Sequence, residues 1–336
     1  MANRDIVVIG GSAGSGAALK RIVADLPADL PASIFIATHV AARSSAYVAE
    51  MLEGIGPLPV GAAIDGQPIE KSHIYVAVPD RHLLLLNGTI TLGEGSRENM
   101  ARPAVDPLFR SAALSYGGRA VGVILSGMLN DGASGLAAIK QCGGTALVQH
   151  PLDAAAAQMP LAALEAVDAD GVASAADMAG LIAETVAAQA GPDLPPPDAL
   201  RLEVQIAAGL RLGSDTLGTI ADPSPIICPD CNGVLSEMRG AHPLRYRCQI
   251  GHARTAESLL TVNPHVDAAI RVAMRVMEER VTLVGRMARE ARETGRLAVA
   301  ELYEARAAEY RRYAETLREA AVTSIRMAGS AQEGEG

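Results

Sequence analysis

A serine in a glycine-rich turn is the first group in the chain that could do chemistry. Residues 10–14 read Gly-Gly-Ser-Ala-Gly, a G-x-S-x-G pattern centred on Ser12, directly after the apolar run Ile6–Ile9. Glycines beside a serine let the backbone turn sharply at a strand end, and the N-terminus of a following helix offers N–H groups to a developing oxyanion. The pattern is typical of a nucleophile, although glycine-rich turns after a first strand are commoner in nucleotide-binding folds.

His39 and Asp131 lie just beyond two other apolar runs, residues 33–38 and 120–125. Taken alone, the histidine has an ordinary structural interpretation, and the aspartate reads as a helix N-cap. Polar groups at the carboxyl ends of parallel strands meet at one edge of the sheet, however. Together with Ser12 they predict a Ser-His-Asp triad, which is defined by geometry and role rather than by chain order. The order Ser, His, Asp excludes the α/β-hydrolase arrangement, in which the aspartate comes second.

Each member of this triad would have a defined role. His39 would take the proton from Ser12 as its oxygen attacks an ester carbonyl, and Asp131 would hold the imidazole and stabilise its charged form. The backbone N–H groups of Ala13 and Met128 are candidate oxyanion donors. Nucleotide binding is disfavoured, because residues 10–16 lack the G-x-G-x-x-G spacing and the second strand ends in Thr-His rather than in an acidic residue.

The elements that would position these residues alternate between strand and helix over residues 5–187. An Asn-Gly pair at 87–88 predicts a hairpin turn. The alternation predicts an α/β fold with a doubly wound, mostly parallel sheet. The expected strands are residues 6–9, 33–38, 74–77, 83–86, 89–92, 120–125 and 145–149, and the expected helices are 15–26, 107–114 and 135–141.

Several motifs in this region resemble the catalytic domain of the bacterial chemotaxis receptor methylesterases (CheB type). They are VVIGGSAG at 7–14, His39, IYVAVPDRHL at 74–83, REN at 97–99, RPAVD at 102–106, LF at 108–109 and the loop 126–135. The resemblance covers residues 5–187. It implies that Ser12, His39 and Asp131 are catalytic, that the partners are methylated chemoreceptor cytoplasmic helices, and that the reaction is hydrolysis of glutamate γ-methyl esters with release of methanol. Glutamine deamidation is a further implied activity.

The chain departs from the family pattern at two points. Residues 13–15 are Ala-Gly-Ser where the common loop has two glycines, which makes Ser15 a rival hydroxyl, expected to point away from His39. The usual enzyme also carries an N-terminal phosphorylatable receiver domain, whereas the first catalytic strand here is expected at residue 6. We therefore expect no such switch in this sequence, and regulation by phosphorylation and a standard chemoreceptor substrate are both open to question.

A cysteine cluster follows in the C-terminal half. The spacing is C-x₂-C, sixteen residues, then C-x₃-H, with the ligands Cys228, Cys231, Cys248 and His252. Two such knuckles joined by a hairpin would hold one tetrahedral zinc ion with no open position, so the ion would be structural; a metal-free site is the alternative. No cofactor is expected for catalysis. The segment also resembles the C-terminal extension of some receiver-less methylesterases.

Composition shifts suggest the remaining boundaries. We expect a catalytic domain at 1–189, a linker at 190–225, a zinc-ribbon-like module at 226–262, a helical hairpin at 263–328 that breaks at Thr294-Gly295, and a disordered tail at 329–336. Apolar residues at helical spacing, such as Val272, Val276, Leu283 and Met287, are expected to pack within the hairpin. The ribbon and hairpin could dock a chemotaxis signalling protein or a second copy of the chain.

The overall composition narrows the function classes. A net charge of −9, no Trp and only two Phe exclude a basic or stacking surface for nucleic acid. No apolar run approaches the ~18 residues of a membrane span, and no secretory signal is present, so membrane insertion is excluded and a cytoplasmic location is expected. A non-enzymatic adaptor that keeps the fold and binds partners through its C-terminal half is the alternative function; the intact triad favours the enzyme.

Two further polar residues precede the helix expected at 107–114. Arg102 and Asp106 could contact substrate or form a structural pair with each other. His82 is expected to pack or to form hydrogen bonds rather than to catalyse.

Overall fold

The computed structural model describes residues 3–39, 47–192, 194–211, 213–261 and 264–333. The chain separates into two compact units, residues 1–258 and 259–336.

A seven-stranded sheet forms the centre of the first unit, in the order β3-β4-β2-β1-β7-β8-β9. All the pairings between neighbours are parallel. The expected α/β fold with a doubly wound parallel sheet is therefore confirmed. The strands are β1 (Ile6–Gly11), β2 (Ser33–Thr38), β3 (Val60–Ala62), β4 (Ile74–Val76), β7 (Ala120–Ile124), β8 (Thr145–Gln149) and β9 (Gly171–Ala173).

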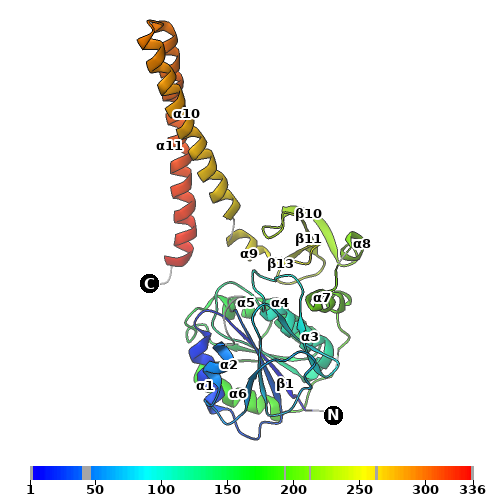
Figure 1. The fold of residues 1–336 in the computed structure, drawn as a ribbon. Coiled ribbons are helices and arrows are strands. Elements are labelled where there is room, and N and C mark those ends of the chain that lie inside the picture. Colours follow the sequence, from blue (N-terminus) through cyan, green and yellow to red (C-terminus); the bar gives the residue numbers. More distant parts are fainter. Residues whose placement is uncertain (1–2, 40–46, 193, 212, 262–263, 334–336) are drawn as a thin grey trace. The chain divides into compact units, whose positions relative to one another are not determined.

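Helices cover both faces of this sheet (Figure 1). Alternate residues of β1 point to opposite faces, so Val7 packs in one core and Val8 in the other. Burial on both faces explains why the strands are continuous apolar runs. The first core includes α1 (Ser15–Asp25), α2 (Tyr47–Leu52) and α6 (Ala175–Ala187), and the second includes α3 (Val105–Tyr116), α4 (Ala133–Gln141) and α5 (Gln158–Ala166).

A hairpin lies beside the main sheet. Strands β5 (His82–Leu86) and β6 (Thr89–Gly93) pair antiparallel across Asn87 and Gly88, both of which have positive φ. The Asn-Gly turn prediction is confirmed, because such a turn needs left-handed backbone at both central residues.

Four antiparallel strands form a second sheet, which we call the ribbon. They are β10 (Ala221–Ile227), β11 (Val234–Met238), β12 (Arg245–Cys248) and β13 (Ala253–Thr255). The short helix α9 (Ala256–Thr261) follows. A 3₁₀ turn (Gly117–Arg119) follows α3. The segment expected as a linker contains α7 (Asp198–Ala208), α8 (Ser214–Leu217) and most of β10. Helix α7 buries Leu200 in the core beside α3, so this segment contributes to packing.

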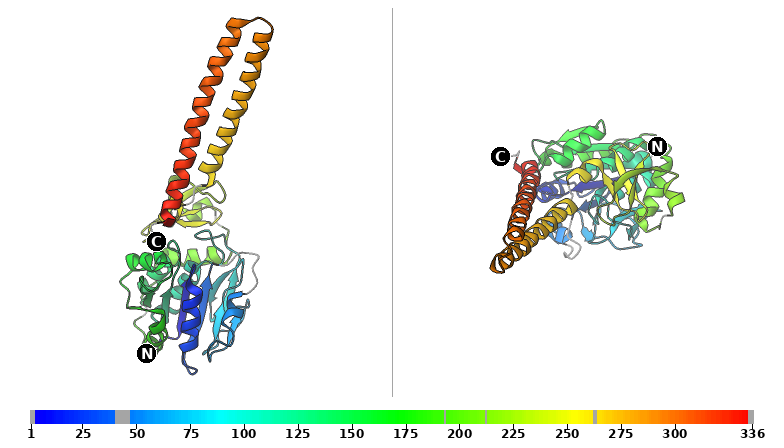
Figure 2. Two further views of the ribbon diagram at one scale, coloured as in Figure 1. Left: turned by 90° about the vertical axis from the view of Figure 1, so that its left-hand side faces the viewer. Right: turned by 90° about the horizontal axis from the view of Figure 1, so that it is seen from above.

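The second unit is a helical hairpin. Helices α10 (Pro264–Glu293) and α11 (Leu297–Glu333) form a long pair joined by a short turn (Figures 1 and 2). The predicted break is confirmed, with Gly295 at φ 74° in the turn. Helix α11 continues into the tail that was expected to be disordered, and residues 334–336 lie outside the described residues.

Among the described side chains of these helices, the fully buried ones are alanines: Ala288 and Ala291 of α10 and Ala300, Ala307 and Ala314 of α11. Larger apolar residues such as Val276 and Val284 are partly buried. The expectation of packing in the hairpin was wrong for Val272, Leu283 and Met287, which are 54%, 59% and 42% exposed. A helix with one neighbour buries only a narrow stripe, and small residues there allow a close approach. Across the described residues, no helix is long and apolar enough to cross a membrane.

Candidate active site

Ser12 follows the carboxyl end of β1, between two strands that carry the other predicted residues. The parallel register aligns Gly11 of β1 with Thr38 of β2, so the next residues along the two strands are Ser12 and His39. The Ser12 Oγ lies 3.0 Å from His39 Nδ1. Gly14 has φ 74° at the start of α1, a left-handed conformation that explains the glycine in the turn.

The rival hydroxyl of Ser15 is turned away, as expected. Its Oγ donates a hydrogen bond of 2.8 Å to the carbonyl oxygen of Ser12, and Ser15 is buried. That hydroxyl is therefore occupied and out of reach of solvent.

His39 connects the serine to Asp131. Its Nε2 lies 2.7 Å from Asp131 Oδ2. Because a carboxylate can only accept, Nε2 carries the proton and Nδ1 is left to accept from the Ser12 hydroxyl. Burial lowers the pKa of His39, but the hydrogen bond and charge of Asp131 outweigh it, and the net pKa is raised above the usual 6.5. The imidazole is thus placed to receive a proton from the serine.

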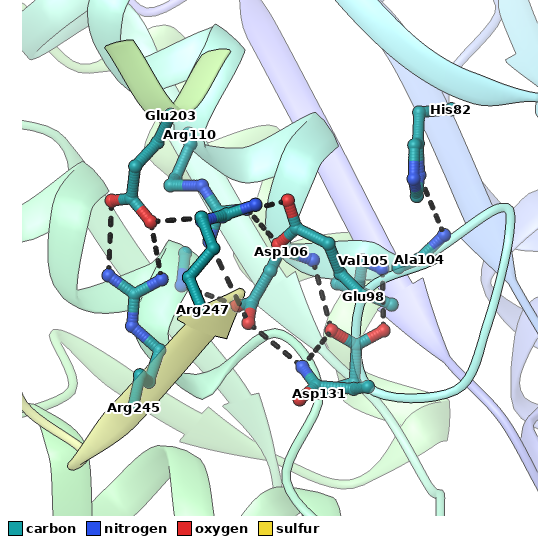
Figure 3. A network of polar contacts seen from close by, with 12 residues as sticks. His82, Glu98, Ala104, Val105, Asp106, Arg110, Asp131, Glu203, Arg245 and Arg247 are labelled. Atoms are coloured by element: carbon teal, nitrogen blue, oxygen red, sulfur yellow. Dashed lines mark hydrogen bonds and ion pairs between the residues drawn. The ribbon is translucent and has the colours of Figure 1, made fainter. Parts of the chain in front are cut away.

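Asp131 is held by several donors in a buried setting. Its Oδ2 also accepts from the N–H of Val105 (2.7 Å), and its Oδ1 accepts from the N–H of Asp106 (3.2 Å) (Figure 3). The same Oδ1 accepts from Asn99 Nδ2 (3.0 Å). Burial raises the pKa of Asp131, yet the contacts with His39, Val105 and Asn99 more than compensate and lower it. The carboxylate therefore stays charged beside the imidazole.

The two candidate oxyanion donors lie at the mouth of the site. Within the described residues, neither the N–H of Ala13 nor that of Met128 has a hydrogen-bond acceptor, and both residues are exposed. The next N–H, of Leu129, donates to Gln158 Oε1 at 2.8 Å, which holds this loop in place. A cleft of about 410 Å³ opens here, lined by Ser12, His39, Arg97, Asn99, Met100, Ala101, Arg102, Met128, Leu129 and Asp131.

Two further residues support Asp131: Asn99, which was not predicted as part of the site, and Asp106, for which contact with substrate was one of two interpretations. Asn99 Nδ2 also donates to Asp106 Oδ2 at 3.1 Å, and Asp106 Oδ1 accepts from the N–H groups of Gly132 (3.1 Å) and Gly135 (2.6 Å). Burial and the charge of Asp131 raise the pKa of Asp106 to about 6. The REN and RPAVD motifs carry these residues, but no spacing rule indicates that they converge on Asp131.

Arg102 and Asp106 do not form the pair that was one of their two interpretations. Arg102 instead binds Asp80, with Nη2 2.6 Å from Oδ1. His82 is buried, with its Nε2 2.9 Å from the carbonyl oxygen of Ser96, in keeping with its expected packing role.

The predicted metal ligands converge at one end of the ribbon. Ligand atoms of Cys228, Cys231, Cys248 and His252 all lie within 4.8 Å of one another. The Sγ atoms of Cys231 and Cys248 are 3.6 Å apart, and Cys248 Sγ is 3.5 Å from His252 Nδ1. All three cysteines are free thiols. This Cys₃His cluster could hold a metal ion, with all four protein positions filled.

Comparison with known proteins agrees with the fold. The sequence model of the family described as CheB methylesterase matches residues 7–182. A Leptospira interrogans protein, provisionally named protein-glutamate methylesterase/protein-glutamine glutaminase, is 39% identical over 180 residues, which are 53% of this chain and 93% of that protein. Protein-glutamate methylesterase/protein-glutamine glutaminase 3 of Anaeromyxobacter dehalogenans is 43% identical over 169 residues, 50% of this chain and 49% of that protein.

A solved structure gives the same result. The Thermotoga maritima CheB methylesterase catalytic domain superposes with a TM-score of 0.52 at 32% identity, covering 55% of this chain and 98% of that one. The residues that the family model matches, 7–182, include Ser12, His39 and Asp131. With the family model matching more than half of its residues, the chain belongs to the CheB methylesterase family.

Proposed function

We propose that this chain is a serine hydrolase that removes methyl groups from glutamate γ-methyl esters of chemoreceptors. The hydrogen-bonded series Ser12, His39, Asp131 at one sheet edge carries the proposal. Relatives named protein-glutamate methylesterase/protein-glutamine glutaminase support the substrate class. The methylated segments lie on cytoplasmic helices, so the enzyme would work in the cytoplasm.

The reaction would proceed in two steps. The Ser12 oxygen attacks the ester carbonyl while His39 Nδ1 takes its proton, and the N–H groups of Ala13 and Met128 bind the oxyanion. The imidazolium, stabilised by Asp131, gives the proton to the departing methoxide, which leaves as methanol. Water, deprotonated by His39, then releases the glutamate and restores Ser12. With a glutamine substrate, ammonia would leave in place of methanol.

Methanol release from methylated chemoreceptor membranes tests this function. Ser12→Ala should lower the rate by at least about 10⁴-fold, because among the described residues that line the cleft no other side chain carries a hydroxyl that could form the acyl-enzyme. Ser15→Ala is the matched control and should keep most of the activity, since that hydroxyl bonds only to a backbone carbonyl.

A serine-reactive fluorophosphonate gives a readout independent of substrate. It should label wild type and Ser15→Ala but not Ser12→Ala. Labelling without methanol release would mean a different ester substrate, whereas neither labelling nor release would favour the adaptor function.

We also propose that the Cys₃His cluster holds a structural zinc ion. Tetrahedral bonds of ~2.3 Å to sulfur place two thiolates roughly 3.8 Å apart, close to the separation of Cys231 and Cys248. One zinc per chain is expected by elemental analysis. Cys231→Ser should lose it, while Cys142→Ala, which changes the cysteine outside the cluster, should retain it. Zinc retained by Cys231→Ser would exclude this ligand set.

A further inference from the structure

A network of buried charges joins the ribbon to the catalytic part of the first unit. Arg245 and Arg247 of β12 both bind Glu203 of α7, at 2.7 and 3.2 Å, and Arg247 also lies 3.0 Å from Glu98 (Figure 3). Arg110 of α3 binds the same Glu98. All five side chains are at most 9% exposed. Buried charges are costly unless paired, so the ribbon is held in one position against this part of the fold.

The last ribbon strand also pairs with a loop that lines the cleft. The N–H of Asn99 donates to the carbonyl oxygen of Ala253 at 2.9 Å, and the N–H of Ala253 donates to that of Arg97 at 3.3 Å. Asn99 and Met100 have φ values of 47° and 68°. A non-glycine pair with positive φ is sustained only where surrounding contacts hold it, and here β13 supplies them.

Thr255 of β13 reaches the active site through two side chains. Its N–H donates to Asn99 Oδ1 at 3.3 Å, and its Oγ1 donates to Asn130 Oδ1 at 2.7 Å. The first contact fixes the orientation of the Asn99 side-chain amide. Its Oδ1 faces Thr255, so its NH₂ group points at the carboxylates of Asp131 and Asp106. The second contact holds the residue immediately before Asp131.

The Cys₃His cluster lies at the base of this strand. Cys248 ends β12 and His252 precedes β13, with the N–H of Cys248 bonded to the carbonyl oxygen of His252 at 3.0 Å. The same turn contacts the catalytic part of the unit, because Ser96 Oγ donates to the carbonyl oxygen of Ile250 at 2.8 Å. An ion bound there would tie the β12–β13 turn to the Cys228–Cys231 knuckle.

From this geometry we propose that the ribbon is a working part of the active site, with Thr255 and Asn99 as positioning residues for Asp131. The strand β13 orients Asn99 and Asn130, and these orient Asp131 against His39; a metal ion held by the Cys₃His cluster would fix β13 in turn. The proposal rests on the proposed hydrolase function. It adds that catalysis depends on a strand, β13, that lies more than 120 positions from the aspartate in sequence.

Thr255→Val is the central test, since it removes the hydroxyl and keeps the shape. Its expected effect is a fall in kcat of roughly 5-fold with KM unchanged, the size of one neutral hydrogen bond. The hydroxyl also accepts from the N–H of Ser258, so a purely structural loss is conceivable. Thr255→Ser, which keeps the hydroxyl, should have the kcat of the wild type. Thr219→Val, which changes an exposed threonine in the same unit, should have no effect.

Asn99→Gly tests the next link in the chain of contacts. Glycine accepts the positive φ, so the backbone is retained while the bridge to Asp131 is lost. The expected fall in kcat is at least about 10-fold, since the lost bond goes to a charged group. Because His39 faces the carboxylates of Asp131 and Asp106, its pKa responds to their position. The His39 pKa, measured by NMR in the resting enzyme, should therefore change in Asn99→Gly and Thr255→Val but not in Thr219→Val.

Removal of the metal is the third test, and hydrogen exchange of the amides of the full chain measures its effect. Chelation should raise the exchange rates of the Asn99 and Ala253 amides and lower kcat, with both restored by Zn²⁺, while the Ser12 amide, bonded to the Ser126 carbonyl, stays protected. Wild-type kcat and His39 pKa in Thr255→Val would overturn the proposal, as would an active metal-free enzyme. If no ester is hydrolysed, the His39 pKa and the exchange rates still test whether the ribbon positions Asp131. Failure of this proposal can therefore be told apart from failure of the proposed hydrolase function.

Discussion

At the scale of single residues, the site depends on the charge of one buried carboxylate. Asp131 raises the pKa of His39 above 6.5 despite its burial. His39 must be neutral to act as a base, so a raised pKa moves the acid limb of the rate profile to higher pH. The proposed mechanism therefore has a measurable signature in its pH dependence.

We predict that kcat/KM falls on acidification with a midpoint above pH 6.5. In Asp131→Asn the midpoint should move to lower pH, because the charge that stabilises the imidazolium is gone, and kcat should fall by up to about 10⁴-fold. Asp222→Asn, in the exposed pair with Arg239, is the control and should leave the profile unchanged. An unchanged midpoint in Asp131→Asn would show that His39 is not the titrating base.

At the scale of elements, strand ends place the catalytic groups and buried ion pairs place the ribbon. The strand, turn and helix around Ser12 and the Asn-Gly hairpin follow from local sequence, because glycine and asparagine carry the required backbone angles. Helix α7 was missed within the expected linker, because three consecutive prolines obscured the helix that starts just after them. Proline is compatible with a helix start, so such a run does not exclude one.

Arg247→Met is predicted to destabilise the first unit by about 3–5 kcal/mol, because Glu98 and Glu203 lose a buried partner. Arg21→Met, which breaks the exposed pair with Asp25, should cost no more than about 1 kcal/mol. Urea unfolding of both variants measures the free energies of unfolding. Equal effects would mean that the buried network contributes no more than a surface pair.

At the scale of the whole molecule, the division into units differs from the expected domains. Residues 1–258 form one compact unit that includes the ribbon, whereas the expected boundary placed the ribbon apart. The helical hairpin is the second unit. Its possible role in dimerisation or in binding a signalling protein stays a prediction, and size measurement of the full chain against a chain lacking it would decide on dimers.

Truncated chains test whether the ribbon belongs to the first unit or forms a separate domain. A chain ending at Thr261, after α9, should keep the fluorophosphonate labelling rate of the full protein, because it retains the whole first unit. A chain ending at Ala190 should melt at lower temperature and label more slowly, since Glu98 loses Arg247 and Asn99 loses its pairing with Ala253. Equal behaviour of the two truncations would mean that the ribbon is dispensable for labelling and for thermal stability.

Local sequence patterns predicted the α/β fold, which is confirmed, as well as Ser12, His39, Asp131 and the four Cys₃His residues, which lie close together in the structure. Each is encoded locally, by apolar runs, glycine turns and short motifs whose geometry follows from the backbone. Packing of the whole unit was needed to reveal that Asn99 bridges Asp131 and Asp106 and that β13 pairs with the loop that lines the cleft, and packing of the hairpin to reveal that its fully buried side chains are alanines. The first two join residues up to 156 positions apart, and the third depends on which face of a helix meets its neighbour. Local patterns carry no information on such contacts, because they arise only when the packed elements bring distant side chains together.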